Sequence, residues 1–217
     1  AGLFGLSDAL FFRTSVEPST PVGVNVEFDE LAFYPFLYWP ISEQALSLTP
    51  QAIERVNRYM QQGGVIVFDS RDAGLGTAQG NLRDLLRQLD IPSLDPLPND
   101  HVINRTFYLI QDAPGRHVDG EVWVEAAINK EQLDPALPFR RLNDGVTPVI
   151  IGSNDWAAAW AINQQGDPLY PVGRGRAGEH QREMAIRFGI NLVMHVLTGN
   201  YKSDQVHVPA LLDRLGQ

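Results

Sequence analysis

One segment of the chain, a helix followed directly by a buried strand, constrains the fold more than any other. Thr49 is a good N-cap residue, Pro50 suits the first helical position, and apolar residues then recur at spacings of three and four up to Gly63-Gly64. Residues 65–68, Val-Ile-Val-Phe, form a β-branched run that is typical of a central parallel strand. The strand ends abruptly in the polar string Asp69-Ser70-Arg71-Asp72, and α/β folds bind their ligands beyond such strand ends. The segment predicts an α/β fold whose chemistry lies at the carboxyl end of strand 65–68.

The rest of the chain alternates strand and helix signals with short loops between them. We expect further strands at residues 31–39, 107–110, 121–125 and 149–151, the first at an edge or a bulge because it contains Pro35. We expect further helices at the N-terminus, at 81–89, at 180–198 with a C-cap at Gly199 or Asn200, and from Pro209 onward. Residues 156–162 fit either a strand or a helix. The pattern predicts one domain over residues 1–217, with a three-layer, flavodoxin-like architecture in which a mostly parallel sheet carries helices on both faces.

The composition excludes several classes of protein. The chain has 217 residues, 44% of them hydrophobic, which is enough for one folded domain. Because 17 Lys and Arg stand against 26 Asp and Glu, the net charge of −9 repels nucleic acid. Every apolar stretch is interrupted before the roughly 18 residues that would span a bilayer, so we expect no direct membrane insertion by these residues. Without cysteine there is no disulfide, thiolate metal site or cysteine nucleophile.

Polar strings follow two of the predicted strands. One is the string 69–72, and the other, Gly152-Ser153-Asn154-Asp155, follows strand 149–151. Because neighbouring parallel strands deliver their following loops to the same edge of the sheet, we expect the two strings to face one crevice. The alternative is that these charges only mark the solvated edge of the sheet. The candidate ligand-binding residues in the two strings are Asp69, Arg71, Asp72, Asn154 and Asp155.

A sixth candidate ligand-binding residue is His101, which follows a proline-rich loop. It could supply a base or a metal ligand, although a single histidine of this kind is more often an exposed or hydrogen-bonded loop residue. His195 is expected in the last turn of the long helix, where the helix dipole favours a cation. The other histidines lack ligand spacing, so we expect no metal site and no cofactor.

Two further motifs are incomplete. Gly152-Ser153 begins a match to the Gly-x-Ser-x-Gly nucleophile motif, but Asp155-Trp156 stand where small residues are needed, which favours a turn role for Ser153. Residues 173–178, Gly-Arg-Gly-Arg-Ala-Gly, lack the Lys-Ser/Thr ending of a phosphate-binding P-loop. We interpret them as a mobile surface loop.

Five strings of the chain resemble one bacterial family, the domain of unknown function DUF4159, and together they span nearly the whole sequence. They lie at residues 30–40, 63–72, 107–116, 150–156 and 199–207. The resemblance implies a class I glutamine-amidotransferase-like fold without known activity, placed at the C-terminus of a large inner-membrane protein whose N-terminal part is similar to aerotolerance regulators. It also implies a further strand upstream of the first helix. Because Ala1 is not an initiating Met, we expect the sequence to be a C-terminal fragment of such a protein.

Two hypotheses of function follow. The favoured one is a non-catalytic ligand-sensing or protein-interaction domain, because class I amidotransferases need a cysteine nucleophile that is missing here. Its expected partners are other domains of the same membrane protein or envelope proteins, and its expected place is a soluble domain associated with the bacterial inner membrane. The alternative is a hydrolase-type enzyme that uses strand-end carboxylates and His101, with or without a divalent metal ion. Convergence of Asp69, Asp72, His101 and Asp155 on one pocket would favour the enzyme.

Overall fold

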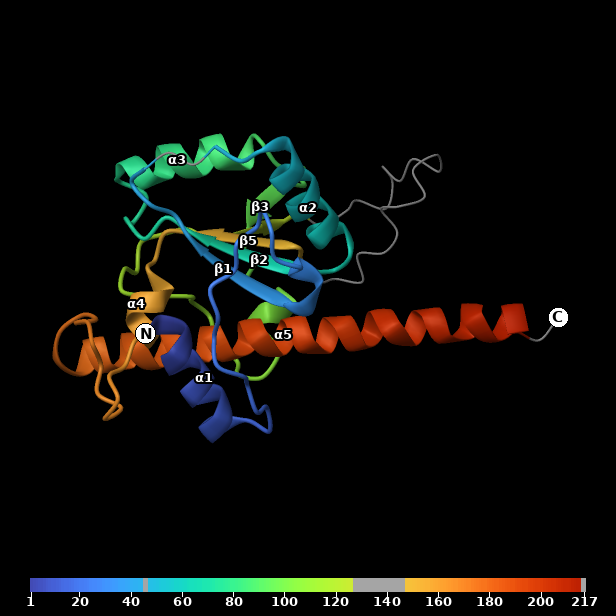
Figure 1. The fold of residues 1–217 in the computed structure, drawn as a ribbon. Coiled ribbons are helices and arrows are strands. Elements are labelled where there is room, and N and C mark those ends of the chain that lie inside the picture. The colour runs from blue at the N-terminus through green and yellow to red at the C-terminus, as the bar shows by residue number, and fades with distance from the viewer. Residues whose placement is uncertain (45–46, 127–146, 216–217) are drawn as a thin grey trace.

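A mixed sheet forms the centre of the protein. The computed structural model describes residues 1–44, 47–126 and 147–215, of which 200–215 are described as helix backbone only. Within these residues a five-stranded sheet has the order β1-β2-β5-β4-β3 (Figure 1). Its strands are β1 (Phe36–Pro40), β2 (Val65–Asp69), β3 (Leu94–Pro96), β4 (Trp123–Glu125) and β5 (Val149–Gly152). The α/β prediction is confirmed, but parallel pairing is limited to β1, β2 and β5, because β4 and β3 join antiparallel.

Helices cover both faces of the sheet. On one face lie α2 (Pro50–Gln61) and α3 (Thr77–Leu86), and on the other lie α1 (Gly2–Arg13), α4 (Trp156–Trp160) and α5 (Gly175–Leu215) (Figure 1). Strand β2 divides the core, because Ile66 and Phe68 pack with α2 and α3 while Val65 and Val67 pack with the opposite layer. All of β2 is buried, as its unbroken apolar sequence predicts.

The helix-and-strand segment that constrains the fold forms as its sequence predicts. The Thr49 side chain accepts a hydrogen bond from the Ala52 backbone N–H at 3.1 Å, and Pro50 begins α2. The buried face of α2 carries Val56 and Met60 at the predicted spacing. Local capping and periodicity were therefore sufficient to define this element.

Two predicted strands are shorter than expected or missing. Residues 31–39 divide into the 3-10 helix η1 (Leu31–Phe33) and the edge strand β1, with Pro35 just before the strand. The prediction of a strand at 107–110 is wrong. That segment follows the 3-10 helix η2 (Val102–Arg105), and the buried Asn191 amide bonds the N–H of Phe107 and both backbone groups of Tyr108. A side chain of α5 thus supplies the hydrogen bonds that a neighbouring strand would supply.

The C-terminal helices also differ from the prediction. Residues 156–160 are the helix α4, which resolves the strand-or-helix ambiguity. Helix α5 begins at Gly175, inside the expected surface loop, and passes through Gly199 and Pro209 to Leu215. A glycine within a helix costs only about 1 kcal/mol relative to alanine, so Gly199 alone does not end α5. His195 consequently lies well before the last turn, and the dipole argument for it does not apply.

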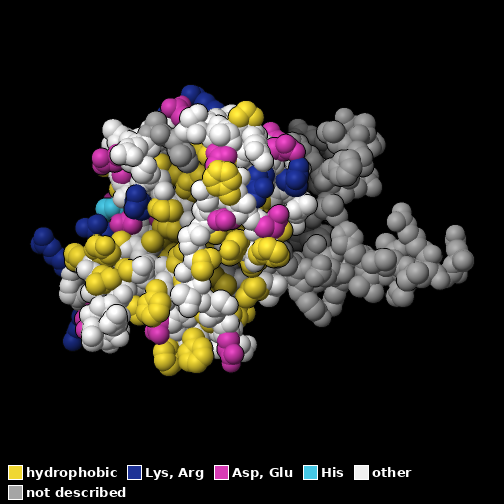
Figure 2. Space-filling model, viewed as in Figure 1, with side chains coloured by type: hydrophobic (Ala, Val, Ile, Leu, Met, Phe, Trp, Pro, Cys, Tyr) yellow, Lys and Arg dark blue, Asp and Glu magenta, His cyan; other side chains and the backbone are white. Residues whose placement is uncertain are grey.

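The surface keeps some large apolar side chains. Figure 2 shows hydrophobic side chains gathered over the middle and lower part of the face seen in Figure 1, with most charged side chains above and around them. The most exposed rings include Phe12 at 74%, Phe33 at 79% and Phe28 at 80%. None of the helices in the described ranges combines the length and the apolar composition of a membrane span.

We predict that Phe188→Ala destabilises the fold by about 3–5 kcal/mol, because it leaves a cavity in the layer between α5 and the sheet. The Phe188 ring is fully buried, and its centroid lies 5.1 Å from that of Trp156. Urea denaturation measures the loss. The exposed Phe28→Ala serves as control and should change stability by less than about 0.5 kcal/mol. An unchanged unfolding midpoint for Phe188→Ala would mean that this side of α5 is not in the core.

Candidate functional site

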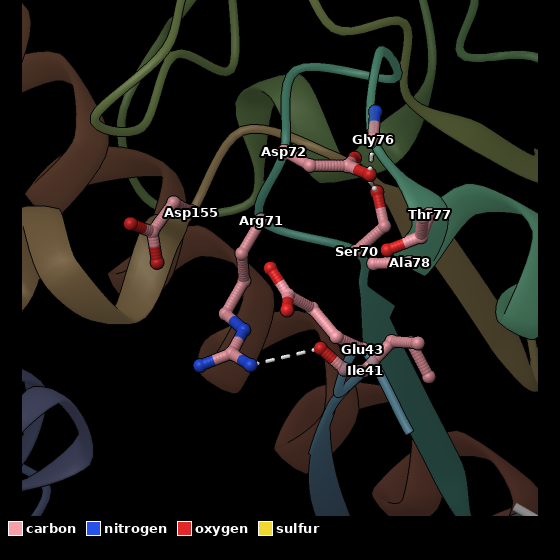
Figure 3. Close-up of a pocket in the computed structure, with 9 residues that line it drawn as sticks. All are labelled: Ile41, Glu43, Ser70, Arg71, Asp72, Gly76, Thr77, Ala78 and Asp155. Atoms are coloured by element: carbon pink, nitrogen blue, oxygen red, sulfur yellow. Dashed lines mark hydrogen bonds between the residues drawn. The ribbon is translucent and has the colours of Figure 1, made fainter. Parts of the chain in front are cut away.

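A cleft of about 230 Å³ lies at the carboxyl ends of the parallel strands. Its walls come from four segments, the loops after β1, β2 and β5 and the first turn of α3 (Figure 3). The lining residues are Ile41, Glu43, Ser70, Arg71, Asp72, Gly76, Thr77, Ala78 and Asp155. The cleft therefore occupies the edge of the sheet where α/β folds bind ligands.

The buried carboxylate of Asp69 lies beneath this cleft and joins its walls. It accepts hydrogen bonds from the Tyr38 hydroxyl at 2.6 Å and from the backbone N–H of Arg71 at 2.9 Å. It also accepts from the N–H groups of Asp155 at 3.2 Å and Trp156 at 2.9 Å. Asp69 is completely buried, so these four donors take up both of its oxygens. It positions the site rather than presenting a group to a ligand.

Tyr38 remains a hydrogen-bond donor to Asp69 at all ordinary pH values. Burial and the neighbouring charge of Asp69 raise the pKa of its hydroxyl well above the usual value. The same hydroxyl oxygen accepts from the Ala157 backbone N–H at 3.2 Å. Strand β1 is thereby connected to the start of α4.

Asp72 is occupied by the capping of α3. Its carboxylate accepts from the Ser70 hydroxyl at 2.7 Å and from the backbone N–H groups of Gly74, Gly76 and Gln79 at 3.0, 3.0 and 3.3 Å. Burial would raise the pKa of this carboxyl, but the four hydrogen bonds outweigh that effect and lower it. Asp72 therefore forms a wall of the cleft as an ionised carboxylate whose oxygens already accept four hydrogen bonds.

Asn154 holds a neighbouring loop, residues 113–120, against the β5 turn. Its amide nitrogen donates to the carbonyls of Ala113 and Gly120 at 3.1 and 3.0 Å, and its oxygen accepts from the Gly120 N–H at 2.9 Å. The contact requires glycine at position 120, because a Cβ there would lie 2.4 Å from the Asn154 side-chain oxygen. These three hydrogen bonds of the buried Asn154 amide all go to the 113–120 loop.

The 113–120 loop brings two side chains to the site, Arg116 and His117, that the sequence argument missed. The Arg116 guanidinium lies 3.7 Å from the carboxylate of Asp155, and His117 is close enough to lower the pKa of that carboxyl. Neither residue directly follows a predicted strand, since the predicted strand before them ends at residue 110, so the rule that selected the other candidates did not reach them. Arg116 does belong to the string 107–116 that resembles the family, but that resemblance assigns no role to Arg116.

Arg71 and Asp155 are the two predicted residues whose charged groups remain available to the cleft. Both have left-handed backbones, with φ of 60° and 53° respectively. Ala73, in the loop after β2, is also left-handed, with φ of 55°. Such a conformation costs a non-glycine residue about 1–3 kcal/mol and is concentrated at functional sites. Figure 3 shows Arg71 extending away from Asp72, with one guanidinium nitrogen 2.8 Å from the Ile41 carbonyl.

Asp155 lies in a mixed electrostatic environment. Burial and the charge of Asp69 raise the pKa of its carboxyl, while Arg116, Arg71 and His117 oppose that rise. Its side chain keeps only 12% of its surface exposed. The carboxyl of Asp155 therefore takes up a proton more readily than an ordinary surface aspartate.

His101 does not line the cleft. Its Nδ1 accepts the Ile103 backbone N–H at 3.2 Å and so caps η2, and its ring centroid lies 6.1 Å from that of His195 on α5. Burial lowers the pKa of the His101 ring. The segment follows β3, which lies at the opposite edge of the sheet from β1. Among the described residues, no group of three or more His, Asp or Glu side chains could hold a metal ion.

We predict that Asp69→Asn costs about 3 kcal/mol of stability, because the amide nitrogen would face backbone donors and leave buried N–H groups unsatisfied. Tyr38→Phe removes one hydroxyl only and should cost about 1–2 kcal/mol. Urea denaturation of both variants provides the comparison. A loss for Asp69→Asn no larger than that for Tyr38→Phe would mean that the carboxylate does not hold the two strand ends together.

We predict that Asp155→Asn stabilises the protein at pH 7. The folded-state pKa of Asp155 is raised, so its ionised form is disfavoured at neutral pH and the penalty disappears as the pH falls below the unfolded-state value of about 3.9. Solvent screening limits the gain to roughly 0.5–1 kcal/mol, and asparagine tolerates the left-handed backbone. Denaturation curves at pH 7 and pH 3.5 measure the difference. A destabilised variant at pH 7 would mean that the contact with Arg116 outweighs burial.

The comparisons with known proteins agree with the resemblance found in the sequence. A search of curated proteins found no match. The family model of the domain of unknown function DUF4159 matches residues 1–197, which is most of the chain. The chain therefore belongs to the DUF4159 family.

Proposed function

We propose that this domain is a non-catalytic binding domain that takes a small polar ligand in the strand-end cleft. One observation carries the proposal: Arg71 and Asp155 come from the ends of different strands, yet both line one cavity of about 230 Å³. Their backbones are strained, and the buried Asp69 carboxylate bonds the N–H of each. Small-molecule sites are concave and use a few precisely placed polar or charged groups to orient the ligand, and Arg71 and Asp155 fit that role.

We further propose that the fold is of the class I glutamine-amidotransferase type. The turn between β5 and α4 supports this assignment, because a left-handed residue between a strand and a helix is how such folds present a nucleophile. Here that residue is Asp155, and the chain contains no cysteine. Ser153 is 93% buried and cannot reach open solvent in the manner of an elbow nucleophile. The site therefore favours binding over acyl transfer.

The alternative function, a hydrolase that uses His101, is less well supported. His101 is engaged in capping η2 and is not among the residues that line the cleft. A catalytic base must come within hydrogen-bond reach of its substrate, which the geometry does not offer to this side chain. His117, and not His101, is close enough to Asp155 to affect the pKa of its carboxyl.

The proposed cellular setting follows from the family resemblance. We place the domain at the C-terminus of a bacterial inner-membrane protein, in contact with other domains of that protein or with envelope proteins. The rings of Phe12, Phe28 and Phe33 are exposed. Hydrophobic side chains also gather on the face shown in Figure 2, which supports protein contacts, since apolar surface patches often mark interfaces. The net charge of −9 argues against a nucleic-acid partner.

We predict that at least one compound in a library of small polar metabolites raises the melting temperature of the domain. At a ligand concentration of 100 times Kd the stabilisation is about 2.7 kcal/mol, or roughly 5–10 °C for a chain of this size. Thr77→Tyr, which fills the cleft from the first turn of α3, should abolish the shift. Asp84→Tyr on an exposed face of the same helix is the matched control and should retain it.

Two outcomes would contradict the proposed function. One is an equal shift in the Thr77→Tyr variant, which would locate the ligand elsewhere. The other is ammonia release from glutamine above a heat-denatured control, which would require catalysis without a thiolate. Either result would remove the non-catalytic binding domain as the function of this cleft.

A further inference from the structure

We propose that Arg71 binds an oxyanion group of the ligand, a carboxylate or a phosphate. This inference rests on the proposed function, because it assigns the chemistry of the ligand in the same cleft. It starts from the bonding state of the guanidinium. Of its five N–H donors, one accounts for the bond to the Ile41 carbonyl at 2.8 Å, and within the described ranges no carboxylate lies at ion-pair distance.

The Arg71 side chain is held in place before any ligand arrives. Its backbone N–H donates to Asp69 at 2.9 Å, and the bond to Ile41 fixes the distal end of the side chain. The left-handed backbone at φ 60° directs the side chain along the cleft (Figure 3). A guanidinium fixed in this way loses little rotamer freedom on binding, and its fork geometry matches the two oxygens of a carboxylate or phosphate.

The negative charges around the cleft do not prevent one anion from binding beside Arg71. Asp72 stays ionised, but its oxygens already accept four hydrogen bonds, and Figure 3 shows the Arg71 side chain extending away from it. Asp155 faces Asp69, Arg71, Arg116 and His117 from the surrounding elements. Glu43 is exposed on the wall beside Arg71 (Figure 3). A bound anion would raise the pKa of Asp155 further, so binding takes up a proton and affinity rises as the pH falls toward that pKa.

The test is an NMR titration of the ¹⁵N-labelled 217-residue chain at pH 6 and fixed ionic strength. Four probes are compared: sodium acetate, sodium phosphate, methylammonium chloride and neutral acetamide. We expect the two anions to shift the amide signals of Arg71, Gly74 and Thr77, and the cation to leave them unchanged. The stronger of acetate and phosphate identifies which oxyanion the cleft prefers.

Three variants make the assignment specific. Arg71→Gln should weaken anion binding at least tenfold, whereas Arg87→Gln, on the exposed end of α3, should bind as the parent does. Asp155→Asn should bind acetate or phosphate more tightly at pH 7, and its affinity for acetate should lose the rise toward low pH that Asp155 causes. This third variant keeps the test valid if Arg71→Gln does not fold.

The outcomes separate this inference from the proposed function. If methylammonium or acetamide shifts the cleft amides and the anions do not, the cleft binds ligands but the oxyanion assignment is wrong. If anion binding survives Arg71→Gln, or weakens in Asp155→Asn, the role of Arg71 is also refuted. If no probe shifts these amides and no metabolite raises the melting temperature, both the inference and the proposed function fail.

Discussion

The buried carboxylate of Asp69 is the interaction on which the site depends. A carboxylate without solvent contact is costly unless hydrogen bonds replace its hydration, and here one hydroxyl and three backbone N–H groups do so. Those donors belong to β1, to the loop after β2 and to the start of α4. The same four bonds therefore stabilise the charge and fix the backbone positions of Arg71 and Asp155. The geometry of the cleft therefore depends on Asp69, which does not itself line the cleft.

The sequence predicted the elements whose signals are local. The capped helix α2, the buried strand β2 and the strand β5 follow from N-capping, periodicity and runs of β-branched residues. The strand expected at 107–110 failed because Asn191, more than 80 residues away, bonds that segment. The antiparallel pairing of β4 also depends on tertiary packing, which no local pattern encodes.

The location of the site could be predicted, but not the state of its side chains. The two polar strings meet as expected, since the Ser70 N–H bonds the Gly152 carbonyl and the Ala73 N–H bonds that of Ser153. Whether a carboxylate or amide in such a string is free depends on partners in other elements. Asp72 is used by the first turn of α3 and Asn154 by the 113–120 loop, whereas Arg116 enters from that loop. Strand-end rules give a place and not an assignment of roles.

The charge of the cleft differs from the charge of the whole chain for the same reason. The chain carries nine more acidic than basic residues, which by itself would disfavour an anionic ligand. At the cleft, however, the oxygens of Asp69 and Asp72 are engaged by backbone and hydroxyl donors, and burial raises the pKa of Asp155. The guanidinium of Arg71 donates to one carbonyl and, among the described residues, forms no ion pair, although Asp155 and the exposed Glu43 line the same cleft. Screening confines the effect of distant charges to about 8–10 Å at physiological salt, so the local balance around Arg71 decides what the cleft attracts.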